Sequence, residues 1–66
     1  MSTKQPRFNV GDRVCERFLF GKQRRETGTV IERYELRDQY RYMVRFEDGR
    51  EELFFERELF SLPLIQ

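Results

Sequence analysis

Residues 41–49 read RYMVRFEDG, and this stretch decides the fold of the chain. Tyr42, Val44 and Phe46 occupy alternate positions, which is the period-two pattern of a strand with one buried face. The Asp-Gly pair that follows predicts a tight turn, because glycine tolerates the positive φ that hairpin turns require. An apolar pattern resumes a few residues later, so the stretch predicts a β-hairpin at the centre of the domain.

The composition is that of one small domain with an aromatic core. A chain of 66 residues buries only ~60% of the surface that it exposes when unfolded. The hydrophobic content is a modest 38%, but seven Phe and three Tyr let few positions fill a core, since each large ring buries ~150–250 Å². The formal net charge is +1, with residues 1–34 basic and residues 35–66 acidic. That asymmetry indicates either a mixed, solvated surface or a basic face opposite an acidic one.

The residue types argue against a metal site and a catalytic centre. Cys15 is the single cysteine and histidine is absent, which removes thiol clusters, the usual zinc ligand and the usual general base. We therefore expect no enzyme activity, no cofactor and no metal. No apolar stretch reaches the ~20 residues that span a membrane, and residues 1–10 lack the apolar run of a signal peptide. The expected location is the cytoplasm, away from membranes.

The remaining chain divides into further short strands. Residues 1–7 read as a polar tail, residues 8–62 as the domain and residues 63–66 as a second tail. Strands are expected over 13–20, 27–36, 40–47, 50–55 and 60–62, with one turn of 3-10 type over 56–59. Closing such strands into a small barrel buries one face and removes most exposed edges. The fold class is therefore all-β, as a five-stranded small barrel.

The same alternation predicts the core and one irregularity. Gly28 inside a strand predicts a bulge or a close approach of another backbone. Val30, Tyr34 and Leu36 are expected on one face of their strand and Ile31 on the other. The predicted core comprises Val10, Val14, Val30, Tyr42, Val44, Phe46, Phe54 and Leu59, with Phe60 as a further candidate.

Four segments carry a resemblance to a known superfamily. They are Val-Gly-Asp-Arg-Val at 10–14, Thr-Gly-Thr-Val-Ile at 27–31, Tyr-Met-Val-Arg-Phe-Glu-Asp-Gly at 42–49 and Phe-Phe-Glu-Arg-Glu-Leu at 54–59. In this order they resemble the SH3-like barrels of the Tudor type, over residues 8–60. The resemblance implies a five-stranded SH3-like, Tudor-like barrel with a 3-10 turn before the last strand. It implies no single function, because this fold carries unrelated activities.

The resemblance also implies a binding site. Tudor domains that read methylated Lys or Arg use an aromatic cage with an acidic rim, because a ring face attracts a cation. Phe18 stands where the first-strand cage aromatic is expected, Phe46 at a second aromatic and Asp48 at the acid. Glu26 and Arg50 occupy two positions where the family has further aromatics.

The main functional hypothesis is a non-catalytic binding or adaptor module for a protein or peptide partner. Phe18 and Phe20 flank the polar loop 21–26, and aromatics at a loop mouth suit peptide contact. Phe46 is either part of that platform or ordinary core. Asp48 either binds the partner or shapes its turn, since Asp side chains accept hydrogen bonds from nearby backbone amides.

An outward-facing patch is a second candidate interface. Phe54 and Phe55 are adjacent, so one of them leaves the core face. Together with Ile31 and Met43, Phe55 would form an apolar surface for a partner or for homo-oligomerisation. Four acids of the same region form either a docking edge or a charged guard against strand aggregation: Glu51, Glu52, Glu56 and Glu58.

Two alternative functions remain. Lys22, Arg24 and Arg25 either contact the phosphates of a nucleic acid, in a transcription accessory, or form a solvated loop. The Gly-Asp-Arg-Val stretch at 11–14 is also similar to that of the plasmid-type dihydrofolate reductases, which are tiny oligomeric SH3-like enzymes. Glu52-Leu53-Phe54-Phe55 replaces the Val-Gln-Ile-Tyr pore segment of that family.

Overall fold

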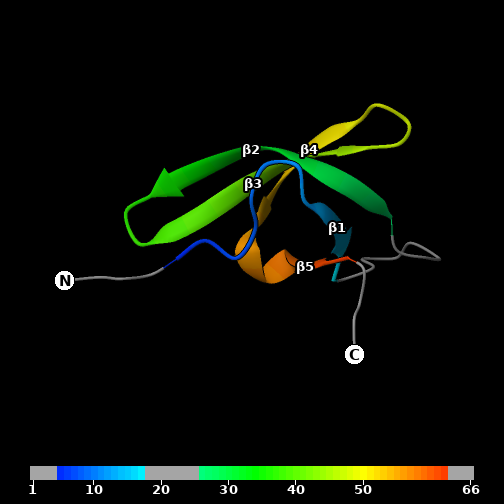
Figure 1. The fold of residues 1–66 in the computed structure, drawn as a ribbon. Coiled ribbons are helices and arrows are strands. Elements are labelled where there is room, and N and C mark those ends of the chain that lie inside the picture. Colours follow the sequence, from blue (N-terminus) through cyan, green and yellow to red (C-terminus); the bar gives the residue numbers. More distant parts are fainter. Residues whose placement is uncertain (1–4, 18–25, 63–66) are drawn as a thin grey trace.

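A computed structural model describes residues 5–17 and 26–62 of the chain (Figure 1). Within these residues the chain is all-β, with five antiparallel strands in one sheet of order β4-β3-β2-β1-β5. The elements are β1 (Arg13–Glu16), β2 (Thr27–Leu36), β3 (Gln39–Phe46), β4 (Glu51–Phe55), the 3-10 turn η1 (Glu56–Glu58) and β5 (Leu59–Ser61). No helix in the described part of the chain is long and apolar enough to cross a bilayer.

The predicted strands are confirmed, with small shifts of their ends. The bounds of β2 are those predicted, and β3, β4 and β5 begin and end within one residue of the prediction. β1 is shorter than the predicted strand over 13–20: it ends at Glu16, and residues 18–20 lie outside the described part. The 3-10 turn stands where it was expected, between β4 and β5.

The sheet is strongly bent but has two edges, β4 and β5. Among the described residues no ladder pairs these two strands, so strand pairing does not close the sheet into the expected barrel. Figure 1 shows η1 and β5 lying beneath the hairpin of β2 and β3. The space between these layers holds the core.

The core is built from alternate residues of the central strands and from one residue of the N-terminal segment, by which we mean residues 5–12. Tyr42, Phe8, Leu59, Val14, Val30 and Val44 are completely buried. Phe46 and Tyr40 are also buried, whereas Phe54 packs against the core from a half-buried position. The Phe8 ring meets the Tyr42 ring edge-on, with centroids 5.2 Å apart. Phe8 and Tyr40 are therefore core residues that were missing from the predicted set, although Tyr40 continues the alternation of β3.

Val10 does not belong to the core, and that prediction was wrong. Its side chain is 60% exposed. The amide of Asp12 donates a hydrogen bond to the carbonyl of Asn9 at 3.0 Å, and Gly11 has a φ of 100°. The resulting turn carries Val10 away from the interior, and Phe8 fills the space instead.

Gly28 marks a close approach, and the bulge lies further along β2. A Cβ atom on Gly28 would stand 2.6 Å from the carbonyl oxygen of Arg45 and 2.7 Å from Cγ1 of Val44. The pairing of β2 with β3 shifts between Val30 and Glu32, so the extra residue is Ile31. The sequence thus predicted the tight packing at Gly28 but not the position of the irregularity.

The bulge turns the second half of β2 over. Val30 lies opposite Val44 and is buried, whereas Tyr34, beyond the bulge, lies opposite Arg41. Tyr34 and Leu36 are 42% and 45% exposed. The prediction that they share a face with Val30 was wrong, because one inserted residue exchanges the two faces of everything that follows it.

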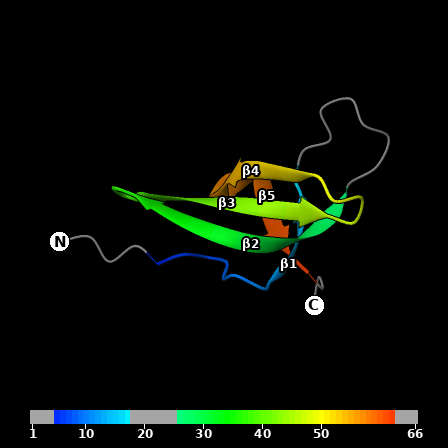
Figure 2. The same cartoon turned by 90° about the horizontal axis from the view of Figure 1, so that it is seen from above.

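The N-terminal segment covers the inner side of the β2–β3 hairpin. Seen from above, β4, β3 and β2 lie side by side and the segment runs alongside β2 (Figure 2). A guanidinium nitrogen of Arg33 donates to the side-chain oxygen of Asn9 at 2.7 Å, and the amide of Arg7 donates to Glu56 at 2.9 Å. The opposite side of the hairpin has no such cover within the described residues.

Candidate functional site

The candidate site is an apolar hollow on the uncovered side of the sheet. We call this side the outer face; it carries Arg41, Met43, Leu53 and Phe55 and, beyond the bulge, Tyr34 and Leu36. The hollow has a volume of about 210 Å³ and is lined by Tyr34, Leu36, Arg41, Met43 and Leu53. Met43 and Leu53 are direct cross-strand neighbours, and Leu53 is 40% exposed. Contiguous exposed apolar surface on a small protein is typical of an interaction site.

Arg41 supplies the charge beside this hollow. Its guanidinium carbon lies 4.3 Å from the centroid of the Phe55 ring, and that of Arg57 lies 4.9 Å from the same centroid. The Nε atom of Arg41 is buried and has no hydrogen-bond partner in the structure. Leaving a buried donor unsatisfied costs about 1–3 kcal/mol. Because this atom is shielded from solvent, the unsatisfied donor is a cost to the fold and does not itself offer a contact to a partner.

The positive charge of this region is not neutralised from within the described chain. The ion pairs of the described residues engage Arg45 and, in the turn after β3, Arg50; the guanidinium groups of Arg41 and Arg57 contact no carboxylate of a described residue. Four residues along β3 from Arg41, by contrast, Arg45 pairs with Glu51 at 2.8 Å. The outer face thus combines an apolar hollow with a cationic end.

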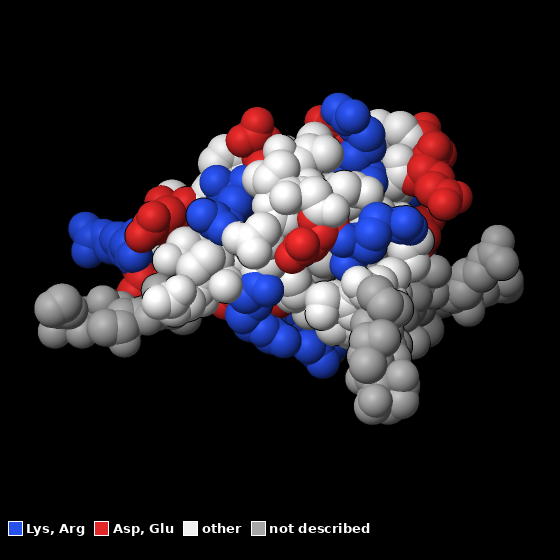
Figure 3. Space-filling model, in the orientation of Figure 1, with Lys and Arg blue, Asp and Glu red and all other residues white. Residues whose placement is uncertain are grey.

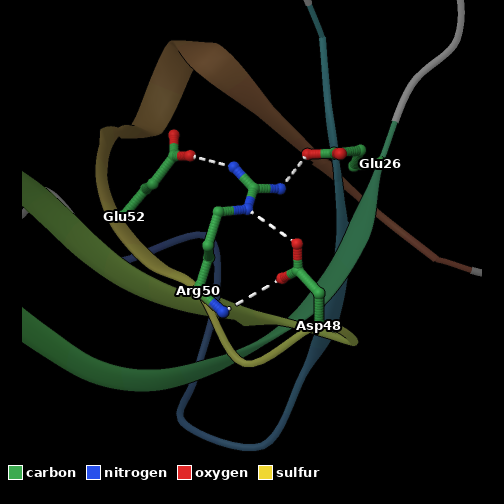
Figure 4. A network of polar contacts seen from close by, with 4 residues as sticks. All are labelled: Glu26, Asp48, Arg50 and Glu52. Atoms are coloured by element: carbon green, nitrogen blue, oxygen red, sulfur yellow. Dashed lines mark hydrogen bonds and ion pairs between the residues drawn. The ribbon is translucent and has the colours of Figure 1, made fainter.

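The turn after β3 forms a separate polar cluster around Arg50 (Figure 4). The guanidinium of Arg50 contacts the carboxylates of Asp48 at 3.0 Å, Glu52 at 2.5 Å and Glu26. Its carbon lies 4.8 Å from the centroid of the Phe46 ring. Hydrogen bonds to Glu26 and Asp48 raise the pKa of Arg50. A cation of the chain itself therefore occupies the face of Phe46.

Phe46 and Asp48, the two predicted site residues in this turn, both have structural roles. The Phe46 ring is buried and packs edge-on against Phe54, with centroids 6.0 Å apart. The amide of Arg50 donates a hydrogen bond to Asp48, and this bond lowers the pKa of the Asp48 carboxyl. These contacts are those of a core residue and a turn residue. Ligand binding by either residue stays a prediction.

The other predicted sites fall partly outside the described residues. Phe18, Phe20, Lys22, Arg24 and Arg25 all lie there, which leaves the loop-mouth platform and the basic loop as predictions. Of the three residues predicted to form an outward-facing apolar patch, Met43 and Phe55 share the outer face. Ile31, at the bulge, lines a different hollow with Arg13, Thr29, Arg45, Phe46 and Glu47.

The four acids that were expected to form a docking edge or a guard are engaged within the chain. Arg45 binds Glu51, Arg50 binds Glu52, the Tyr42 hydroxyl donates to Glu56, and the Phe55 amide donates to Glu58. On the side of the molecule drawn in Figure 3, acidic and basic side chains are interspersed. That view fits a mixed, solvated surface.

Sequence reasoning missed most residues of the hollow. The alternation of β3 and β4 places Arg41 beside Met43 and Leu53 beside Phe55, which was a usable signal. The contribution of β2 was hidden, because the bulge reverses which of its residues face outward.

In comparisons with known proteins, no family model, curated protein sequence or solved structure matches the chain. Among the described residues no group of three or more His, Cys, Asp or Glu could hold a metal ion. The geometry of the outer face is therefore the basis for a functional proposal.

Proposed function

We propose that this chain is a non-catalytic binding module that docks a protein partner on its outer face. One observation carries the proposal: Tyr34, Leu36 and Leu53 are each at least 40% exposed around one hollow, on the side of the hairpin that the N-terminal segment leaves open. Removing large apolar side chains from water favours association, and the gain is partly offset by the freedom that the partners lose on binding. The hollow is thus a natural anchoring point for a partner side chain.

The size and lining of the hollow favour a protein partner over a small substrate. Its volume of about 210 Å³ lies below the ~300–1,000 Å³ of typical small-molecule sites. Arg41 is the single ionisable group in its lining apart from the Tyr34 hydroxyl. Such a site lacks a paired acid and base, and it has room for a side chain or two of a partner.

The proposed family is the SH3-like barrel of the Tudor type, in a cytoplasmic protein. The strand order β4-β3-β2-β1-β5 and the 3-10 turn before β5 support it. The bend that brings η1 and β5 beneath the β2–β3 hairpin is in keeping with it as well. The family proposal is independent of the docking face, because the fold hosts many kinds of site.

Affinity capture with two matched variants tests the docking face. The wild-type protein, Leu53→Asp and Val10→Asp are immobilised, and bound proteins from the native host are identified by mass spectrometry. Both substitutions place a carboxylate at an exposed apolar position, but only Leu53 lies on the outer face. We expect Leu53→Asp to lose partners that Val10→Asp retains, with both variants folded by circular dichroism. Equal capture by all three proteins would refute the proposal.

A further inference from the structure

The proposed docking face has a charge arrangement that specifies its partner. Resting on the proposed function, we infer that the outer face binds an extended acidic peptide segment of another protein, with a large apolar residue two positions away from an Asp or Glu. The apolar side chain enters the hollow, and the carboxylate meets Arg41.

The cross-strand register sets the spacing. Tyr34, Arg41 and Phe55 lie opposite one another in one row across β2, β3 and β4, and Glu32, Met43 and Leu53 form the next row. Residues two apart on a strand project to the same side, about 7 Å from each other. An extended peptide that runs along β3 has the same repeat. An apolar residue over the Met43 row therefore brings the residue two positions along over the Arg41 row.

The charges of the two rows determine over which row the acidic residue of the peptide lies. Glu32 lies opposite Met43, so a carboxylate of the peptide is repelled from that row. In the other row the guanidinium of Arg41 has no carboxylate partner among the described residues. Arg57, which shares the Phe55 ring with Arg41, adds positive charge nearby. A carboxylate of the peptide neutralises this charge.

Arg45 provides a matched control within the same strand. Like Arg41 it lies two residues from Met43 and on the outer face, but its guanidinium is paired with Glu51 through two hydrogen bonds of 3.0 and 2.8 Å. A peptide carboxylate gains little from a guanidinium that already has a carboxylate partner. The two arginines therefore differ in the property on which the inference depends.

The experiment uses a phage-displayed library of random 12-residue peptides, selected on the immobilised wild-type protein. Enriched peptides are synthesised with a fluorophore, and dissociation constants are measured by anisotropy. We expect enrichment of an apolar residue two positions from Asp or Glu. Replacing that acid by its amide, in a peptide bound to unaltered protein, should weaken binding about tenfold or more, since hydrogen bonds to charged groups are worth ~1.5–3 kcal/mol. Arg41→Gln should weaken binding equally, and Arg45→Gln less than about twofold.

The outcomes separate the inference from the proposed function. If Leu53→Asp abolishes binding but neither the amide peptide nor Arg41→Gln weakens it, the docking face stands and the acidic partner is refuted. If selected peptides bind Leu53→Asp as well as wild type, the docking face itself is refuted. Failure of the library to yield any binder refutes the inference. Self-association of the wild type that Leu53→Asp abolishes, measured by sedimentation, would show that a second copy covers the face and would refute it too.

Discussion

Arg50 and Arg41 place similar guanidinium groups near aromatic rings in opposite electrostatic settings. Arg50 lies over Phe46 and contacts three carboxylates. Arg41 lies over Phe55 and contacts none among the described residues. A cation over a ring face gains ~0.5–2 kcal/mol in either setting, so the ring contacts do not distinguish the two. The carboxylates do: they satisfy Arg50 within the chain, whereas Arg41 keeps its charge available.

At Gly28 the space for a side chain is missing. Gly28→Ala should lower the free energy of unfolding by roughly 1–3 kcal/mol, because the added Cβ would overlap backbone and core atoms of β3. Urea denaturation measures this loss. Glu35→Ala, at an exposed position of the same strand, should change stability by less than about 0.5 kcal/mol. An equal effect of the two substitutions would contradict the close approach.

The Tyr42 hydroxyl makes the stability sensitive to alkaline pH. Burial of the ring and the hydrogen bond to Glu56 raise the pKa of Tyr42 from 10.0 to about 12. Because the folded protein holds this proton more tightly than the unfolded chain, the stabilisation is complete below pH 10 and is lost as pH rises toward 12.

Urea denaturation at several pH values between 9 and 12 tests this linkage. We expect the free energy of unfolding of the wild type to fall more steeply over this range than that of Tyr42→Phe. Tyr34→Phe, which alters an exposed tyrosine of the outer face, is the control and should keep the wild-type slope. Parallel curves for the wild type and Tyr42→Phe would contradict the assignment.

Among the elements, the N-terminal segment is an integral part of the fold. Its described residues, 5–12, form no strand, yet they contribute Phe8 to the core and hydrogen bonds to Arg33 and Glu56. A chain this short has few other large side chains to close the inner side of the β2–β3 hairpin. The segment therefore covers the inner side of the hairpin, as an additional strand or helix does in a larger domain.

Phe8→Ala and Val10→Ala test this role against the sequence-based prediction. Removing the buried Phe8 ring should cost about 3–5 kcal/mol, a large part of the stability of a small domain. Val10→Ala should cost less than about 0.5 kcal/mol, because its side chain is 60% exposed. Thermal and urea denaturation measure both. A larger loss of stability for Val10→Ala than for Phe8→Ala would place Val10 in the core and contradict the observed turn.

For the whole molecule, local patterns predicted the elements, and the way they face one another was harder to predict. The alternation of Tyr42, Val44 and Phe46 and the Asp-Gly turn gave the central hairpin correctly, because both signals depend on neighbours in sequence. Val10 was misplaced and Phe8 missed, because the choice between them depends on a turn that packs against distant strands. The outer hollow was missed because isoleucine is common on either face of a strand. The residue type at position 31 therefore does not reveal the bulge.

The residue inserted at Ile31 is one that β2 can lose without losing the outer hollow. Deleting it would remove the bulge and leave the pairs on either side unchanged, with Val30 opposite Val44 and Glu32 opposite Met43. Tyr34 would stay opposite Arg41, on the outer face. A single-residue deletion further along β2 would instead exchange the faces of the residues that follow it. In a set of homologous chains, the place of a one-residue gap would therefore show whether the docking face is kept.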